Sequence, residues 1–266
     1  MSNRGVYPTK LKNHTPSYRA SLTYGGRHIS LGSFSSREAA HQAYLEGKRI
    51  LSGQTDERID DLETICESSV LPFAKIVTLL NLRDNGMYLP TPIYIFPRYF
   101  HYYLSTDKHL TFDKEDLFYY ASHRIMQRGS HLFVADYGMQ VNIRSRYGIR
   151  PFAVSGRDYR FINADETDFR LSNIEIINPY HGVLRMGTFG QYRYKALLHL
   201  RGNRIIGIYD TPEEAAIAYN KAVDRAHLAG ISKRFPINYI EGLSPRRYAE
   251  IYDGIHLPAS LLKGLS

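Results

Sequence analysis

Residues 158–178 hold the polar side chains whose types and spacing come nearest to a catalytic site. Asp168, Arg170 and Asn173 form an Asp–x–Arg–x–x–Asn pattern in a turn-rich stretch, directly before the run Ile174–Ile177. Hydrolysis of a phosphodiester needs a general base that takes a proton from water and a divalent ion that stabilises the leaving oxygen. The residues of this stretch must therefore decide whether the chain cuts nucleic acid or only holds it.

Basic charge is concentrated at the two ends of the 266-residue chain. Residues 1–53 carry a net charge of +6, residues 54–180 carry −3 and residues 181–266 carry +5, which gives +8 for the chain. Clustered Lys and Arg side chains favour a polyanion, because neutralised phosphates release their condensed counterions. Ordinary solvated basic surface is the alternative interpretation.

Cys66 is the single cysteine, which argues against a disulfide framework and a cysteine-based zinc site. The first ten residues lack the apolar core of a signal peptide, and no run approaches the roughly 20 apolar residues of a membrane span. We therefore expect a cytoplasmic protein, located in the cytoplasm or nucleoid of a bacterial host.

Two segments near the ends of the chain repeat the same order of residues. Tyr18–Leu22 reads aromatic, base, alanine, variable residue and leucine, and so does Tyr194–Leu198. A glycine turn and a second alternating run follow each segment, which indicates a β-hairpin. Behind the capping boxes Ser35–Glu38 and Thr211–Glu214, an alanine-rich helix is predicted in both copies. With a first strand at its opening Gly–Val pair, each copy is predicted to be a three-stranded sheet with one packed helix.

The copies at residues 4–53 and 181–230 resemble the Apetala-two/ethylene-response-factor DNA-binding domain. They share with it the opening Gly–Val, the aromatic–x–Ala–x–aliphatic strand and the Glu–Ala–Ala helix; the Leu–Gly–x–Phe strand end of the first copy is Ile–Gly–Ile–Tyr in the second. The resemblance implies that the exposed sheet face lies in the major groove of duplex DNA. Most family positions for strand arginines and tryptophans hold Tyr, Ser, Thr, Leu or His here, so the family's target sequence does not carry over.

Alternation along the strands predicts which side chains face the DNA. In the first copy Ala20 and Leu22 should face the helix, and Arg19, Ser21 and Thr23 the DNA. The other outward-facing candidates are Tyr7, His28, Ser30, Lys195, Leu197 and His199. Basic candidates for phosphate or base contacts at strand ends and in turns are Arg4, Lys10, Lys12, Arg27, Arg185, Arg193, Arg201 and Arg204. The alternative is a pair of sheet–helix domains that pack on protein.

The middle of the chain, residues 54–180, is predicted to connect the N-terminal module (1–53) to the C-terminal module (181–235) and a helical tail (236–266). Apolar spacing predicts helices within 56–81. The pair Asp113 and Asp116 predicts the cap of a helix that runs to about Met126, and alternation in His131–Val134 predicts a strand.

Residues 158–178, with the flanking repeats, resemble the HNH homing-endonuclease family, in which nuclease motifs are often fused to Apetala-type domains. The family pattern runs Asp–His–x–x–Gly–x–x–x–x–Asn–Arg–x–x–Asn–Leu. Asp168 is the acidic residue often found before Asn–Arg, Arg170 matches the Arg, and Asn173–Ile174 match the Asn–Leu end. The remaining family positions are occupied here by Arg160 for Asp, Phe161 for the catalytic His, Ala164 for Gly and Phe169 for the first Asn.

These replacements remove the residues that the family's chemistry requires. Phe161 has no lone pair for a general base, and Arg160 repels a divalent ion where the family offers a carboxylate. The kept residues Asp168, Arg170 and Asn173 are predicted to brace a loop, with contact of the arginines to the duplex as the alternative. Neighbouring Arg144, Arg146 and Arg150 are candidate phosphate contacts, with plain solvation as the alternative. His123, His131 and His181 are the alternative candidates for a general base, but none of them belongs to a recognisable motif.

We therefore expect an α+β protein in which two sheet-plus-helix modules flank a degenerate HNH-like domain of ββα type. The expected function is sequence-specific binding of double-stranded DNA, as a transcriptional repressor descended from a phage or mobile-element homing endonuclease. We expect no cofactor, no metal, no membrane association and no small-molecule substrate, and we predict no oligomeric state. The alternatives are an active nuclease or nickase with a rearranged metal site, and an interaction protein that binds no DNA.

Overall fold

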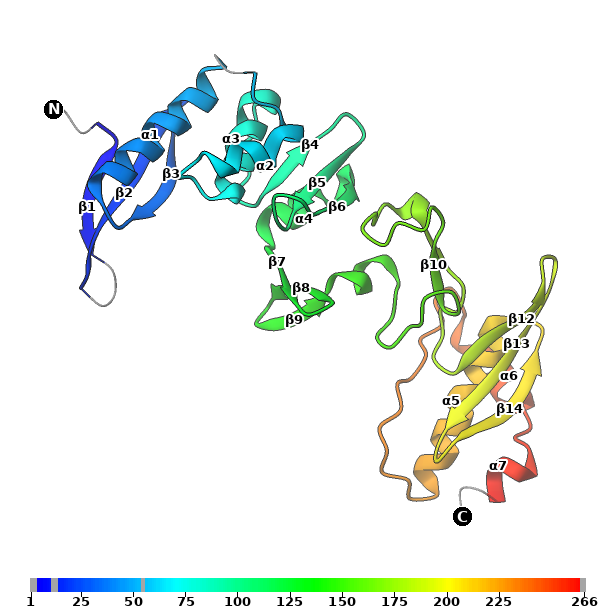
Figure 1. Cartoon of the computed structure of the whole chain (residues 1–266). Helices are drawn as coiled ribbons and strands as arrows, with labels where there is room; N and C mark the ends of the chain where they lie inside the picture. Colours follow the sequence, from blue (N-terminus) through cyan, green and yellow to red (C-terminus); the bar gives the residue numbers. More distant parts are fainter. Residues whose placement is uncertain (1–3, 11–13, 54–55, 264–266) are drawn as a thin grey trace. The chain divides into compact units, whose positions relative to one another are not determined.

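The computed structural model describes residues 4–10, 14–53 and 56–263 (Figure 1). Contacts group the chain into two compact units: unit 1 is Met1–Ile143 with Asp165–Asn173, and unit 2 is Arg144–Ala164 with Ile174–Ser266. The chain therefore passes between the units three times. The described residues form small antiparallel sheets and helices, which confirms the α+β class.

The N-terminal part of unit 1 is a three-stranded sheet followed by a helix, as predicted. The strands pair in the order β1 (Val6–Lys10), β2 (Pro16–Tyr24) and β3 (Arg27–Phe34), and α1 (Arg37–Ser52) follows. Gly25 and Gly26 join β2 to β3 with φ of 55° and 76°, values that a tight hairpin turn demands and that glycine adopts without strain.

Helix α1 lies between this sheet and a second layer of helices. Ala40 and Ala43 are fully buried in one hydrophobic core with Leu31 of the sheet. The same core continues into α2 (Leu62–Glu67) and α3 (Phe73–Asn85). Helices on both sides of the predicted boundary between residues 53 and 54 therefore share one core.

Helix α1 begins one residue later than the predicted capping box. Ser36, and not Ser35, accepts a hydrogen bond from the Ala39 N–H at 3.1 Å. In the second copy Thr211 accepts from the Glu214 N–H at 3.2 Å, as predicted. The glutamate of the Glu–Ala–Ala sequence is therefore the second residue after the cap in α1 and the third residue after the cap in α5.

The middle of unit 1 contains two further three-stranded sheets. Their strands are β4 (Ile93–Ile95), β5 (Tyr99–Tyr103) and β6 (His109–Asp113) in one, and β7 (Ile125–Arg128), β8 (His131–Asp136) and β9 (Met139–Asn142) in the other. Helix α4 (Leu117–Ser122) ends before the predicted limit at Met126, because Ile125 is buried and pairs with Val134 as part of a strand. The predicted strand at His131–Val134 is confirmed.

Unit 2 begins with a short hairpin formed by the HNH-like segment. Strand β10 (Tyr159–Phe161) pairs with β11 (Ile174–Ile176), and the loop between them belongs in part to unit 1. Residues 177–182 contain no helix before the next strand. Of the expected ββα arrangement, the described residues therefore contain the two strands only.

The C-terminal part of unit 2 repeats the topology of the N-terminal sheet and helix. Its elements are β12 (Val183–Thr188), β13 (Gln191–His199), β14 (Asn203–Tyr209) and α5 (Pro212–Leu228), followed by α6 (Pro245–Gly254) and α7 (Ala259–Lys263). The β-bulge between Ala196 and Leu197 matches the one between Ala20 and Ser21. Leu261 of α7 is buried in the same core as β14 and α5. Helix α6 packs on α5, where the Tyr252 hydroxyl donates to the Asp224 carboxylate at 2.8 Å.

A glycine–tyrosine contact sets the position of sheet against helix in both copies. Gly182 has a φ of +69°, and the Tyr219 ring occupies the space that a Cβ atom would need. The Leu197 carbonyl oxygen lies 2.5 Å from the same point. Gly5, with a φ of +82°, meets Tyr44 in the same way. Any side chain at either glycine would force the sheet and the helix apart.

We expect Gly182→Ala to lower the free energy of unfolding by about 1–3 kcal/mol more than Gly242→Ala, measured by chemical denaturation. Gly242 has a similar φ of +74°, but nothing lies within 4 Å of its Cβ position. Gly242→Ala therefore introduces the backbone strain of a positive φ without a steric clash. Equal losses of stability in the two variants would show that the Tyr219 contact does not hold the sheet in place.

Candidate nucleic-acid interface

The outer face of the N-terminal sheet, opposite α1, carries polar side chains. Across the strands, Tyr7 pairs with Arg19 and Thr23 pairs with His28. These four side chains and Ser30 are exposed. The alternation predicted from the sequence is therefore confirmed for these five residues, which we call the polar face.

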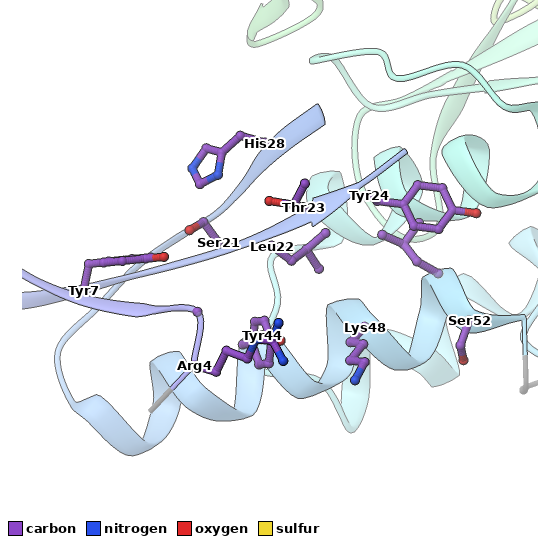
Figure 2. A pocket seen from close by; sticks show the side chains of 12 residues that line it. Arg4, Tyr7, Ser21, Leu22, Thr23, Tyr24, His28, Tyr44, Lys48 and Ser52 are labelled. Atoms are coloured by element: carbon purple, nitrogen blue, oxygen red, sulfur yellow. The ribbon is translucent and has the colours of Figure 1, made fainter. Parts of the chain in front are cut away.

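Ser21 lies in the middle of the polar face but is only 2% exposed. Figure 2 shows its side chain between those of Tyr7 and His28. Its N–H donates a hydrogen bond to the Gly5 carbonyl at 2.9 Å. Strand alternation assigns Ser21 to the correct side, but the two larger neighbours cover it, and its expected accessibility to DNA is not observed.

The basic candidates of the first copy lie in different surroundings. Arg4 and Lys10 are exposed at the two ends of the β1 segment. Arg27 belongs to the opposite side of the sheet, because its neighbour His28 faces outward, and its guanidinium carbon lies 5.2 Å from the centre of the Tyr88 ring. Lys12 lies outside the described residues.

A groove of about 470 Å³ follows the edge of β2 beyond Ala20, where β1 no longer pairs with it. Figure 2 shows Tyr7, Thr23 and His28 on the sheet side of this groove, and Tyr44, Lys48 and Ser52 of α1 on the other. Arg4 also lines it. The groove thus joins the polar face to two cations, the residue types that contact phosphates beside a base-reading surface.

Lys48 was missed by the motif comparison, although the sequence contained a signal for it. Tyr44, Lys48 and Ser52 are spaced by four residues and therefore share one face of a helix. Tyr44 packs against Gly5, directly before the first strand. The same face should therefore have placed Lys48 beside the sheet.

The outer face of the C-terminal sheet is chemically different. Lys195, Leu197 and His199 lie on it as predicted. They share it with Ile205, which pairs with Leu197 and is 56% exposed, and with Ile208, which pairs with Lys195 and is 48% exposed. Exposed aliphatic side chains therefore occupy much of this face.

Arg185, predicted as a phosphate or base contact at a strand end, does not lie on the outer face of the sheet. Its cross-strand partner is Tyr194, a ring that packs on the core beneath the sheet. The Arg185 guanidinium contacts Glu175 at 3.5 Å and stacks 4.4 Å from the centre of the Tyr192 ring.

The remaining arginines of the second copy are exposed. Arg193 forms an ion pair with Asp210 at 3.0 Å. Arg201 lies in the turn between β13 and β14, and Arg204 is at the start of β14. Arg193 therefore lies towards one end of the sheet, and Arg201 and Arg204 lie at the other.

The HNH-like positions in the β10–β11 hairpin have structural roles. Phe161 is buried and packs edge-on against Tyr159, with 5.8 Å between ring centres. Arg160 forms an ion pair with Glu175 at 2.6 Å across the two strands. The side chains at the family's base and metal positions thus stabilise the hairpin.

The loop between β10 and β11 docks against β6 of unit 1. The Thr111 N–H donates to the Thr167 carbonyl at 2.9 Å, and the Phe169 N–H donates to the Thr111 carbonyl at 2.8 Å. The Phe169 ring is 1% exposed and stacks on Phe112 with 5.6 Å between centres. Phe169, in the place of the family's first Asn, is therefore a core residue.

Asp168, Arg170 and Asn173 brace this loop from within. Arg170 donates to both carboxylate oxygens of Asp168, at 2.9 Å and 2.6 Å. The Asn173 side-chain amide donates to the carbonyls of Asp165 and Asp168, at 3.2 Å and 2.9 Å. This geometry supports the predicted structural role of the three residues.

A buried carboxylate, Asp158, organises the base of the hairpin in unit 2. Arg157 donates to it at 2.7 Å, Arg150 at 3.2 Å and the Val154 N–H at 2.8 Å. Burial raises the pKa of Asp158, but the Arg157 and Val154 hydrogen bonds and the Arg150 charge outweigh this effect, so its pKa lies below the usual value. Arg150 is therefore engaged within the fold, as is Arg144, which donates to the Tyr159 hydroxyl at 2.7 Å.

The three histidines considered as substitute bases have separate environments. In unit 1, His123 contacts Asp136 at 3.6 Å, and His131 is exposed at the start of β8. In unit 2, His181 lies 3.4 Å from Arg150, and burial together with that charge lowers its pKa. Among the described residues, no cluster of three or more His, Cys, Asp or Glu side chains could hold a metal ion.

Comparisons of the chain with protein-family models, with curated proteins and with solved structures found no significant match in any of the three. The resemblances stated from motifs therefore stay predictions. In the described part of the chain, no helix combines the length and apolar character needed to cross a bilayer.

We expect Phe169→Ala to lower the free energy of unfolding by about 3–5 kcal/mol, because it opens a cavity beside Phe112. Leu171→Ala in the same loop should change it by no more than about 0.5 kcal/mol, since that side chain is exposed. Denaturant titration followed by circular dichroism measures both. A Phe169→Ala variant as stable as the wild type would contradict the anchoring role.

Proposed function

We propose that the protein binds double-stranded DNA sequence-specifically through the outer faces of its two terminal sheets and does not cleave it. The observation that carries this proposal is the polar face of the N-terminal sheet. Its opposite side is covered by α1, and α1 in turn by α3, so the polar face is the side of this sheet that remains open. It presents a cation, hydroxyl groups and an imidazole on the hydrogen-bonded strands of the sheet.

The size and chemistry of the polar face suit the major groove. That groove is about 12 Å wide and admits β-ribbons, and its base edges present hydrogen-bond donors and acceptors. Arg19 is the candidate for a bidentate contact to guanine, with Thr23, His28 and Ser30 beside it. Arg4, Lys10 and Lys48 would position the sheet through phosphates.

The C-terminal sheet would grip a second stretch of duplex. Lys195 and His199 lie on its outer face, with Arg201 and Arg204 near its end. Two modules on one chain raise the overall affinity, because the second contact forms at a high effective concentration. The net charges of +6 and +5 at the chain ends agree with two contacts to a polyanion.

The residues at the HNH-like positions support the proposal that the protein does not cleave DNA. Phe161 and Phe169 are packed in hydrophobic surroundings, and Arg160 is paired with Glu175. General-base catalysis alone contributes about 10²–10⁴-fold, and neither aromatic side chain can supply it. A protein that binds a promoter tightly without cutting blocks transcription, so repression is the role we propose, with descent from a homing endonuclease.

We expect Arg19→Ala to weaken binding to a selected genomic fragment by about 10–100-fold, the loss of one good base contact. Arg246→Ala removes the same charge from α6 and should leave the affinity nearly unchanged. Gel-shift titration measures both, on fragments recovered by binding and mapped by footprinting. Equal affinities of the two variants, or wild-type binding that barely changes between low and moderate salt, would contradict the proposal.

We expect Phe161→His to restore no cleavage of that fragment with Mg²⁺ or Mn²⁺, because Arg160 and Phe169 still replace the other two groups. The assay is conversion of supercoiled plasmid that contains the footprinted site. Metal-dependent cutting by the wild-type protein, lost on substitution of a His or Asp, would establish a nuclease instead.

A further inference from the structure

The C-terminal sheet presents an aliphatic surface where the N-terminal sheet presents hydroxyl groups. Strand register and the shared bulge place Leu197 where the first copy has Ser21, and Ile205 where it has Ser30. By the same register Ile208 replaces Ser33, and Leu184 replaces Tyr7. We call Leu184, Leu197, Ile205 and Ile208 the aliphatic face.

The core of unit 2 does not explain the aliphatic face. Helix α5 and the C-terminal tail pack on the other side of the sheet, where Ala196, Leu198 and Ile206 are buried. Ile205 and Ile208 instead keep about half of their surface exposed. Side chains of this kind on an open surface indicate a binding site.

Charge restricts what can cover this face. Strands β12, β13 and β14 contain no Asp or Glu, whereas Lys195 lies among the aliphatic side chains, between Leu184 and Ile208. Arg193 is on the same face, and Arg201 and Arg204 lie near its edge. Two copies packed symmetrically about Lys195 would bring like charges together, which is unfavourable. The occupant must offer both apolar groups and negative charge.

The major groove of DNA offers this combination. Each thymine projects a C5-methyl group into it, and apolar side chains distinguish thymine by contact with that methyl, while the phosphates lie along both edges. We propose that the aliphatic face contacts thymine methyl groups and that Lys195 contacts a neighbouring base acceptor or phosphate. This inference rests on the proposed function. The two modules then read different base pairs with one fold.

The test uses full-length protein and the footprinted fragment, with deoxyuridine in place of thymine in one protected segment at a time. This change removes only the methyl group and leaves the pairing and the O4 acceptor intact. In one segment we expect affinity to fall about fourfold for each methyl group that becomes buried, and tenfold or more for two. In the other segment, read by the polar face, we expect a smaller loss.

The double variant Leu197→Ser/Ile205→Ser, which restores the residue types of the first copy, should bind thymine and deoxyuridine DNA equally. Leu228→Ser is the matched control, because Leu228 is an exposed leucine at the end of α5, and it should keep the deoxyuridine effect. Thermal unfolding of both variants checks that they fold. Since the substituted side chains lie outside the core, we expect wild-type melting.

Four results would overturn this inference. Wild-type binding without a deoxyuridine effect overturns it and leaves the proposed function standing, as does a deoxyuridine effect that the double variant retains. A change of oligomeric state in the double variant, seen by sedimentation with DNA affinity unchanged, would assign the aliphatic face to a second copy. Failure of the wild type to bind DNA at all would remove the proposed function and this inference together.

Discussion

The packing of one helix on one side of each terminal sheet is the constraint on which the rest of the structure depends. A three-stranded sheet has two faces, and α1 or α5 buries the inner one, which carries Ala20 and Leu31 in the first copy and Ala196 and Leu198 in the second. The approach is close because a glycine without Cβ meets a tyrosine ring in each copy, Gly5 with Tyr44 and Gly182 with Tyr219. Further helices cover the far sides of α1 and α5, which leaves the outer sheet faces for function.

The β10–β11 hairpin and its loop have structural side chains at the positions where the HNH resemblance would place catalytic ones. Its loop carries Phe169 into the aromatic core of unit 1, while Phe161 packs in the hairpin of unit 2. Arginine–carboxylate pairs, Arg170 with Asp168 and Arg160 with Glu175, neutralise the buried and half-buried charges around them. Both aromatic replacements contribute burial energy where the family's polar residues would need water or a metal.

Local signals in the sequence predicted the terminal sheets and helices well. Alternation, glycine turns and the Thr211 cap depend on neighbouring residues only, and they located the polar face, Lys195 and Leu197. The burial of Ser21 could not be predicted this way, since it depends on the sizes of Tyr7 and His28 on adjacent strands. Arg185 was assigned by its charge, although strand parity already placed it on the side opposite Leu184.

Long-range contacts account for the remaining differences. Helix α4 stops at Ser122 because Ile125 is recruited into the β7–β8 pair, and no local signal marks that choice. The docking of Phe169 on β6 joins positions more than 50 residues apart in sequence. The pairing of β4, β5 and β6 likewise depends on contacts that no motif in the central region records.

Photo-crosslinking tests most directly whether the polar face contacts DNA. A photoreactive amino acid would replace Ser30 on that face, and in a second variant Glu67, which is exposed on α2 beyond α1. With both variants bound to the footprinted duplex, the account predicts crosslinks from position 30 and none from position 67. Binding that leaves position 30 uncrosslinked while position 67 reacts would contradict it.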